Sequence, residues 1–208
     1  MNKRLKLEEG PHFLGRWINE KREDKIDEFV NYYIVFNFLY ERYSDDYYTE
    51  FERYVKRRTD LNNYWARDKD GNGITYKKGD KVFKVYNFPE WRRYKFFLWF
   101  LKDQLGGLGF DPCSKLCLES ELVKDPVKNL GKGRYQPNVI DLKDDGMKLV
   151  YDIFDNIYAI RCNLFHGDKV VQHRSRDLKL IEEASAILKD LLNAYMVFQF
   201  GEHWQDLM

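Results

Sequence analysis

Three things are scarce in this sequence of 208 residues: cysteine, long hydrophobic runs and net charge. The three cysteines cannot all pair within one chain, which argues against a disulfide framework and for a reducing cytoplasm. No stretch approaches the roughly 18 apolar residues of a membrane span, and the N-terminus lacks the apolar core of a signal peptide. We therefore expect a cytoplasmic protein with no membrane-spanning segment.

The near-neutral charge restricts how the chain can bind nucleic acid. Its 35 Lys and Arg residues are balanced by 34 Asp and Glu residues, so the formal net charge is +1. Because no basic surface can cover the whole molecule, any binding to nucleic acid must come from a local patch. The abundant residues are instead aromatic, at 17% of the chain, which suits a helical core filled with rings.

The spacing of apolar residues predicts three helices in the first half. Residues 24–43 have apolar side chains three and four apart, and the Ser-Asp-Asp stretch 44–46 indicates a break with a new N-cap. A second helix is expected to continue to about residue 58. A third begins at Pro89 and is apolar on nearly all sides, so it should be buried on several.

Two segments do not have a helical pattern. Residues 66–88 contain the turn signals Asp-Gly-Asn-Gly and Lys-Gly-Asp beside short β-favouring runs, which predicts a hairpin inserted between helices. Residues 106–145 are rich in Gly, Pro and Lys and predict a long, mostly irregular connection, with a short helix around 114–122 left open.

Two further helices are expected near the C-terminus, at about 144–165 and 176–200, with Ser175 as an N-cap of the second. The expected stripe of the last helix includes Leu178, Ile181 and Ser185. Residues 1–208 then form a single, mainly α domain: an up-and-down helical bundle with a small β-hairpin insertion and a long irregular loop.

Arg161 is the unusual residue of the helix at 144–165. At about 100° per residue, Val150 and Phe154 lie within about 20° of it, so the arginine is central in the apolar face. A charge seldom occupies such a position without a partner. His166 lies about 140° away, so the two side chains converge only if the helix ends between them, as Gly167 would permit, or if a second copy completes the site.

The arginine and histidine occur in a longer motif at the end of an aromatic-rich helix, followed by a long C-terminal helix. This arrangement resembles the HEPN superfamily (higher eukaryotes and prokaryotes nucleotide-binding), most closely over residues 147–200 and in the prokaryotic branch found in toxin–antitoxin and phage-defence proteins. The string that carries the resemblance is Ile160-Arg161-Cys162-Asn163-Leu164-Phe165-His166-Gly167.

The resemblance implies a metal-independent endoribonuclease that needs no cofactor and acts as a homodimer with a composite active site. His166 would exchange protons with the ribose 2′-hydroxyl or the leaving 5′-oxygen, and Arg161 would hold the scissile phosphate. The products would carry 2′,3′-cyclic phosphate and 5′-hydroxyl ends. Active members often have Asn, Asp or His directly after the arginine; here Cys162 stands there, with Asn163 next, and both are expected to support the site.

The resemblance also implies partners: RNA, and an antitoxin or defence-system protein. In toxins silenced by a nucleotidyltransferase antitoxin a tyrosine often lies two places after the histidine. This chain has Asp168 there, so that mode of control is not expected.

A basic run follows the motif directly. It has two interpretations of equal weight, a solvated helix start or a contact with the RNA backbone. A weaker version of the same pattern, Lys128, Lys132 and Arg134, lies in the 106–145 segment. The residues of the basic run are Lys169, His173, Arg174 and Arg176.

Two less specific interpretations of the motif stay open. The arginine could pair with a core acid such as Asp155 or Glu182 while His166 caps a helix. The fold could also serve as a non-catalytic RNA- or nucleotide-binding or protein-assembly module.

Neither apparent metal motif is expected to bind a metal. The stretch from Asp68 resembles the opening of an EF-hand loop, but its twelfth position is Gly79, where calcium needs a bidentate glutamate. Cys113 and Cys117 have no second pair and no nearby histidine.

Overall fold

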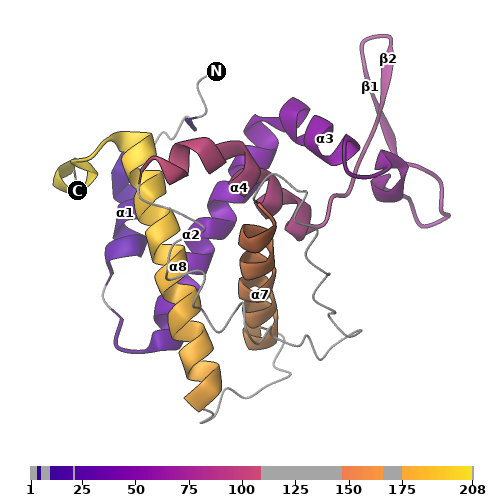
Figure 1. The fold of residues 1–208 in the computed structure, drawn as a ribbon. Helices are drawn as coiled ribbons and strands as arrows, with labels where there is room; N and C mark the ends of the chain where they lie inside the picture. Colours follow the sequence, from indigo (N-terminus) through magenta and orange to yellow (C-terminus); the bar gives the residue numbers. More distant parts are fainter. Residues whose placement is uncertain (1–3, 6–9, 21, 109–146, 166–174, 208) are drawn as a thin grey trace.

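The computed structural model describes residues 4–5, 10–20, 22–108, 147–165 and 175–207 (Figure 1). Over these residues the chain is mainly helical with one small antiparallel hairpin, as expected. Two single-turn 3₁₀ helices, Leu61–Tyr64 and Trp204–Leu207, accompany the longer elements. The main helices are α1 (Gly10–Asn19), α2 (Lys25–Asp46), α3 (Tyr48–Lys56), α4 (Glu90–Gly106), α7 (Lys148–Phe165) and α8 (Ser175–Phe200).

The core is built from aromatic rings, as the composition predicts. Helix α2 is central and packs against α1, α4 and α8, while α7 packs against α4. Phe36 of α2 is fully buried and its ring lies 5.9 Å from that of Phe97 on α4 and 5.1 Å from that of Phe154 on α7. Three helices distant in sequence are thus joined by contacts between rings, which prefer such tilted or edge-on arrangements.

Helix α2 begins as predicted but ends later. Asp24 is its N-cap and accepts a hydrogen bond from the backbone N–H of Ile26 at 2.6 Å. The predicted break and second helix are present, but the break lies at Tyr47 and not at 44–46, because α2 continues to Asp46 and α3 begins at Tyr48. Ser44 is buried inside the helix, and its hydroxyl donates to the carbonyl of Tyr40 at 2.7 Å, the bond by which a helical serine satisfies itself without ending the helix.

Helix α4 agrees with its prediction, and helix α1 was not predicted. Pro89 precedes α4 as its N-cap, and rings on several faces of the helix are buried. Helix α1 contains Gly10, Pro11 and Gly15, which weaken a helical pattern. It forms because Leu14 and Ile18 are buried in the common core, and tertiary packing overrides local propensity.

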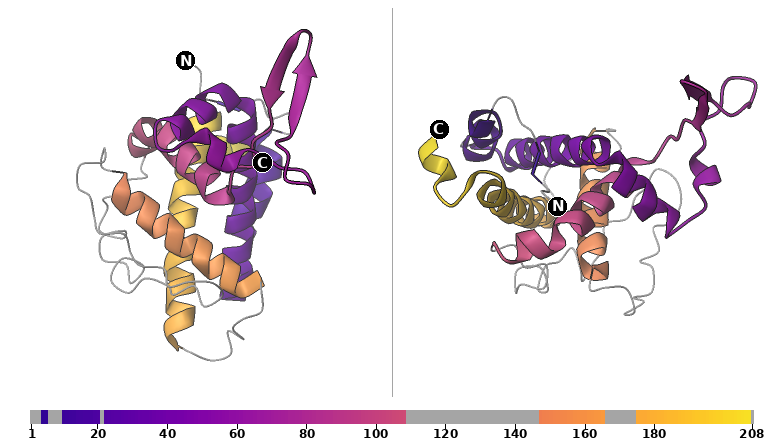
Figure 2. Two further views of the ribbon diagram at one scale, coloured as in Figure 1. Left: turned by 90° about the vertical axis from the view of Figure 1, so that its right-hand side faces the viewer. Right: turned by 90° about the horizontal axis from the view of Figure 1, so that it is seen from above.

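The predicted hairpin is confirmed. Strands β1 (Thr75–Lys78) and β2 (Lys81–Lys84) pair antiparallel, and Gly79 between them has φ of +62°, a conformation that favours glycine. The hairpin projects away from the helices in every view (Figures 1 and 2). The Asp68 carboxylate accepts the backbone N–H of Asp70 and of Asn72, so it closes the preceding turn.

The C-terminal helices also follow the predicted pattern. Helix α7 is described from Lys148, and residues 144–146 lie outside the described part, as do the connection after 108 and the short helix left open at 114–122. Ser175 is the first residue of α8 rather than its N-cap. Ile181 and Ser185 are buried as expected, but Leu178 is 37% exposed. None of the helices described is long and apolar enough to cross a membrane.

Candidate active site

Arg161 lies on the last turn but one of α7, and its guanidinium is held by rings rather than by an acid. The guanidinium carbon lies 5.8 Å from the centre of the Tyr33 ring on α2 and 5.2 Å from that of Phe165. Its Nη1 also approaches Cys162 Sγ at 3.9 Å, a weak hydrogen bond. The side chain is half-buried.

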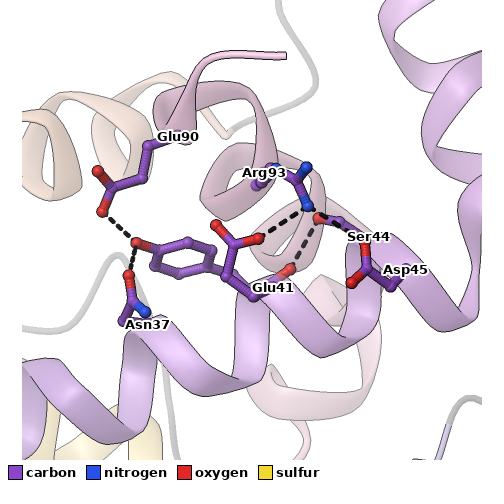
Figure 3. Close-up of polar contacts among 7 residues, drawn as sticks. Asn37, Glu41, Ser44, Asp45, Glu90 and Arg93 are labelled. Atoms are coloured by element: carbon purple, nitrogen blue, oxygen red, sulfur yellow. Dashed lines mark hydrogen bonds and ion pairs between the residues drawn. The ribbon is translucent and has the colours of Figure 1, made fainter. Parts of the chain in front are cut away.

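Glu90, in the first turn of α4, is the charge that most influences Arg161. Its carboxylate accepts a hydrogen bond from the hydroxyl of Tyr33 at 3.0 Å and lies in contact with the hydroxyl of Tyr40. Tyr40 in turn contacts the side-chain oxygen of Asn37 (Figure 3). Tyr158 of α7 also interacts with Glu90, so helices α2, α4 and α7 meet at a carboxylate surrounded by phenols. We call this group the Glu90 cluster; it consists of Glu90, Tyr33, Tyr40 and Tyr158.

The electrostatics of the cluster favour a charged arginine and neutral phenols. Burial works to lower the pKa of Arg161, but the negative charge of Glu90, with a smaller contribution from Cys162, outweighs it and raises that pKa. Burial, followed by the charge of Glu90, raises the pKa of Tyr33 and of Tyr158. At neutral pH the phenols therefore stay protonated and act as hydrogen-bond donors.

Arg161 is not sealed by a core acid. Asp155, one of the two acids that could pair with it in the alternative interpretation, instead binds Lys95 Nζ at 2.7 Å and the hydroxyl of Tyr94. Glu182, the other, is exposed on α8. Within the described part of the chain no carboxylate lies at ion-pair distance from Arg161, so most of its N–H donors are free to bind an anion.

The structure brings only part of the predicted site together. Cys162 is half-buried beside Arg161, and Asn163 is half-buried without a side-chain hydrogen bond to another described residue. Arg176 lies in the first turn of α8, where only its backbone is described. The remaining predicted site residues lie outside the described part of the chain: His166, Lys169, His173 and Arg174. The same is true of Cys113, Cys117, Lys128, Lys132 and Arg134.

No local pattern in the sequence indicates the Glu90 cluster. In the sequence, Glu90 is an acidic residue that follows a proline at the start of a helix. Tyr33 is one of several aromatic residues in an apolar stripe. They lie 57 residues apart and meet only because α2 and α4 pack together. Glutamate in a first helical turn is ordinary, so local pattern alone could not have marked it as a neighbour of Arg161.

No protein-family model, curated protein or solved structure matches this chain. Function therefore has to be inferred from the residues and their geometry. Within the described ranges no three His, Cys, Asp or Glu side chains converge as metal ligands. What the described residues do offer is a fixed guanidinium with free donors, held at the end of the helix that leads directly to His166.

Proposed function

We propose that this chain is a HEPN-like endoribonuclease that cleaves RNA without a metal ion and leaves 2′,3′-cyclic phosphate and 5′-hydroxyl ends. One observation carries the proposal: Arg161 is held between rings beside Glu90, yet no described carboxylate pairs with it. Desolvating a guanidinium costs free energy that a bound phosphate would offset. The motif that resembles the HEPN family supports RNA as the source of that phosphate.

In the proposed reaction the ribose 2′-oxygen attacks the adjacent phosphorus and the bond to the 5′-oxygen breaks. A 2′,3′-cyclic phosphate forms, the proton of the 2′-hydroxyl is removed, and the leaving 5′-oxygen takes up a proton. A histidine titrating near neutral pH suits these proton transfers, so His166 is assigned to them. Arg161 binds the non-bridging oxygens, whose negative charge grows in the transition state.

We further propose that two copies combine to form the site. On a regular helix Arg161 and His166 diverge by about 140°, so a second copy offers a direct way to supply the missing partner. A cell-level role as a toxin or phage-defence effector, with an antitoxin or defence partner protein, fits a nuclease of this kind.

The direct test is to incubate the purified chain with single-stranded RNA and transfer RNA in the presence of EDTA. Wild type should cleave, and His166→Ala should cleave about 10²- to 10⁴-fold more slowly, the usual contribution of a positioned acid–base group. Product ends should resist labelling at the 3′ side until the cyclic phosphate is opened and the resulting phosphate is removed. Cleavage by His166→Ala at the wild-type rate would rule out the proposed chemistry.

A second candidate is a non-catalytic RNA- or nucleotide-binding or assembly module of the same fold. The nearness of Glu90 favours it, because a carboxylate that raises the pKa of Arg161 also partly neutralises that charge. Cell growth separates the two candidates: expression of wild type should inhibit growth and Arg161→Ala should not. Equal inhibition by both would favour the non-catalytic module.

A further inference from the structure

An open surface cavity of about 440 Å³ lies where the end of α3, the first half of α4 and the start of α7 meet. Its size is that of a small-molecule site. None of the side chains lining it is acidic. They are Tyr54, Arg57, Arg58, Trp91, Arg92, Lys95 and Tyr151.

Two of the four cations of this cavity, Arg58 and Arg92, are placed by rings. The guanidinium carbon of Arg58 lies 4.0 Å from the centre of the Tyr54 ring, and that of Arg92 lies 4.0 Å from the centre of the Trp91 ring. Arg92 Nε donates to the hydroxyl of Tyr64 at 3.1 Å. A ring face fixes the plane of a guanidinium while leaving its in-plane donors free for an anion.

Only one of the four positive charges has a carboxylate partner among the described residues. Lys95 is paired with Asp155 at 2.7 Å, and no described acid pairs with Arg57, Arg58 or Arg92. In a chain of net charge +1 this is a local excess of positive charge. Like charges gathered at one cavity repel one another, and an anion in their midst removes the repulsion.

The walls are aromatic as well as basic. Tyr54 and Tyr151 are buried, and their hydroxyls lie 3.3 Å apart. Trp91 is half-buried, so part of its ring is available to a ligand. A nucleotide of a single strand is bound through its phosphate by guanidinium groups and through its base by an accessible aromatic ring. This cavity has both.

We infer that this cavity binds a nucleotide unit, with the phosphate held by Arg57, Arg58 and Arg92 and the base against Trp91. The assignment uses neither Arg161 nor His166. The choice of a single RNA strand as the source of the nucleotide rests on the proposed function. The cavity is lined by Trp91 of α4 and Tyr151 of α7, and the same two helices carry Glu90 and Arg161.

The test uses a fluorescent 2′-O-methyl oligoribonucleotide of about ten units, within the length of known single-strand sites. It lacks the 2′-hydroxyl nucleophile, so binding is measured without cleavage. Arg57→Gln with Arg92→Gln should weaken binding at least about tenfold and reduce the salt dependence by about 1.4 in slope, which is two phosphate contacts. Arg53→Gln, an exposed arginine one turn earlier on α3, is the matched control and should change affinity less than about twofold.

Competitors identify the ligand. Displacement by an unlabelled oligoribonucleotide but not by AMP assigns the site to an RNA strand, whereas equal displacement by AMP assigns it to a free nucleotide. An abasic oligomer should bind at least about fivefold more weakly, because base stacking on Trp91 is lost.

Three results would overturn the inference: equal weakening by Arg53→Gln and by the double variant, equal displacement by a poly-glutamate peptide, or unchanged binding of the double variant. Because Arg57 is exposed, Arg57→Gln alone provides a second variant that should fold if the double variant does not. Binding without any cleavage by wild type would reject the proposed function and leave this inference standing.

Discussion

Two consecutive arginines of α4 have opposite surroundings. Arg93 binds Glu41 at 2.8 Å and Asp45 at 3.3 Å, both on α2 (Figure 3). Arg92 lies against the rings of Tyr64 and Trp91 and contacts no described carboxylate. The first arginine is neutralised by the protein and ties two helices together. The second has no compensating carboxylate among the described residues, and Arg161 resembles it in this respect.

The comparison separates charges that stabilise the fold from charges that are available to ligands. Both kinds are half-buried, so burial alone does not distinguish them. The identity of the neighbours does, because a carboxylate satisfies the donors of a guanidinium whereas a ring face leaves most of them open. Removing a charge of each kind should therefore affect different measurements.

The largest expected difference is in catalysis. Arg161→Ala should reduce the rate of RNA cleavage by about 10²- to 10³-fold, the usual loss when one group that stabilises transition-state charge is removed. Arg93→Ala should leave that rate within about twofold. Rates of both variants are measured on the same RNA in EDTA, after circular dichroism shows that both are folded. A comparable rate loss in Arg93→Ala would contradict the distinction between arginines paired with carboxylates and arginines held by rings.

Tyr40→Phe should have the next largest effect, this time on stability. The substitution removes a hydroxyl that contacts both Glu90 and Asn37, leaving polar groups in a half-buried place short of a partner. The free energy of unfolding should fall by about 1–3 kcal/mol, measured by urea denaturation. Tyr76→Phe, on the exposed hairpin, is the control and should change it by less than about 0.5 kcal/mol. An equal change in the free energy of unfolding for both variants would show that the cluster does not stabilise the fold.

The contribution of the Glu90 cluster to the free energy of unfolding should decrease at alkaline pH. Burial raises the pKa of Tyr33, Tyr40 and Tyr158 above the unfolded value of about 10. The folded state then holds protons that the unfolded state has lost. The stabilisation is complete below about pH 10 and is lost as pH rises toward the folded pKa values.

Each such tyrosine lowers the free energy of unfolding by up to about 1.4 kcal/mol per pH unit in that interval. Urea denaturation at several pH values measures the slope, which should be shallower in Tyr40→Phe. A free energy of unfolding that stayed constant above pH 10 would contradict the raised pKa values.

The smallest difference concerns the two arginines themselves. Arg93→Ala should lower the free energy of unfolding by up to about 1 kcal/mol, because it breaks contacts with two carboxylates near the surface. Arg92→Ala loses contact with two rings but no ion pair, and its effect should be smaller, whereas its effect on oligonucleotide affinity should be larger. Thermal denaturation of the two variants side by side decides this, and a reversed order would count against the comparison.

Local pattern predicted most of the elements that the structure describes. The periodicity of α2, α4, α7 and α8 was evident from apolar spacing, and glycines marked the hairpin. The break between α2 and α3 comes later than the predicted 44–46, because a serine can bond to its own helix as well as cap a new one. Helix α1 was missed because its glycines and proline hide a stripe that only the assembled core stabilises.

The site was predicted less completely, for a different reason. Arg161 was identified by its conflict with the apolar face around it, which is a local signal. Glu90 and the basic cavity carry no such signal, because each of their residues is ordinary where it stands. The histidine of the motif lies outside the described residues, so its assigned role stays a prediction.

Helices α2, α4, α7 and α8, the hairpin and the anomaly at Arg161 could be inferred from the residues alone, because they depend on the spacing of residue types within one element. Which charges are compensated depends on how the helices pack. Arg93 meets two carboxylates, Arg92 meets rings, and Arg161 lies near Glu90 without pairing with it. Electrostatic interactions depend on distance and burial, and neither is defined until helices distant in sequence pack together.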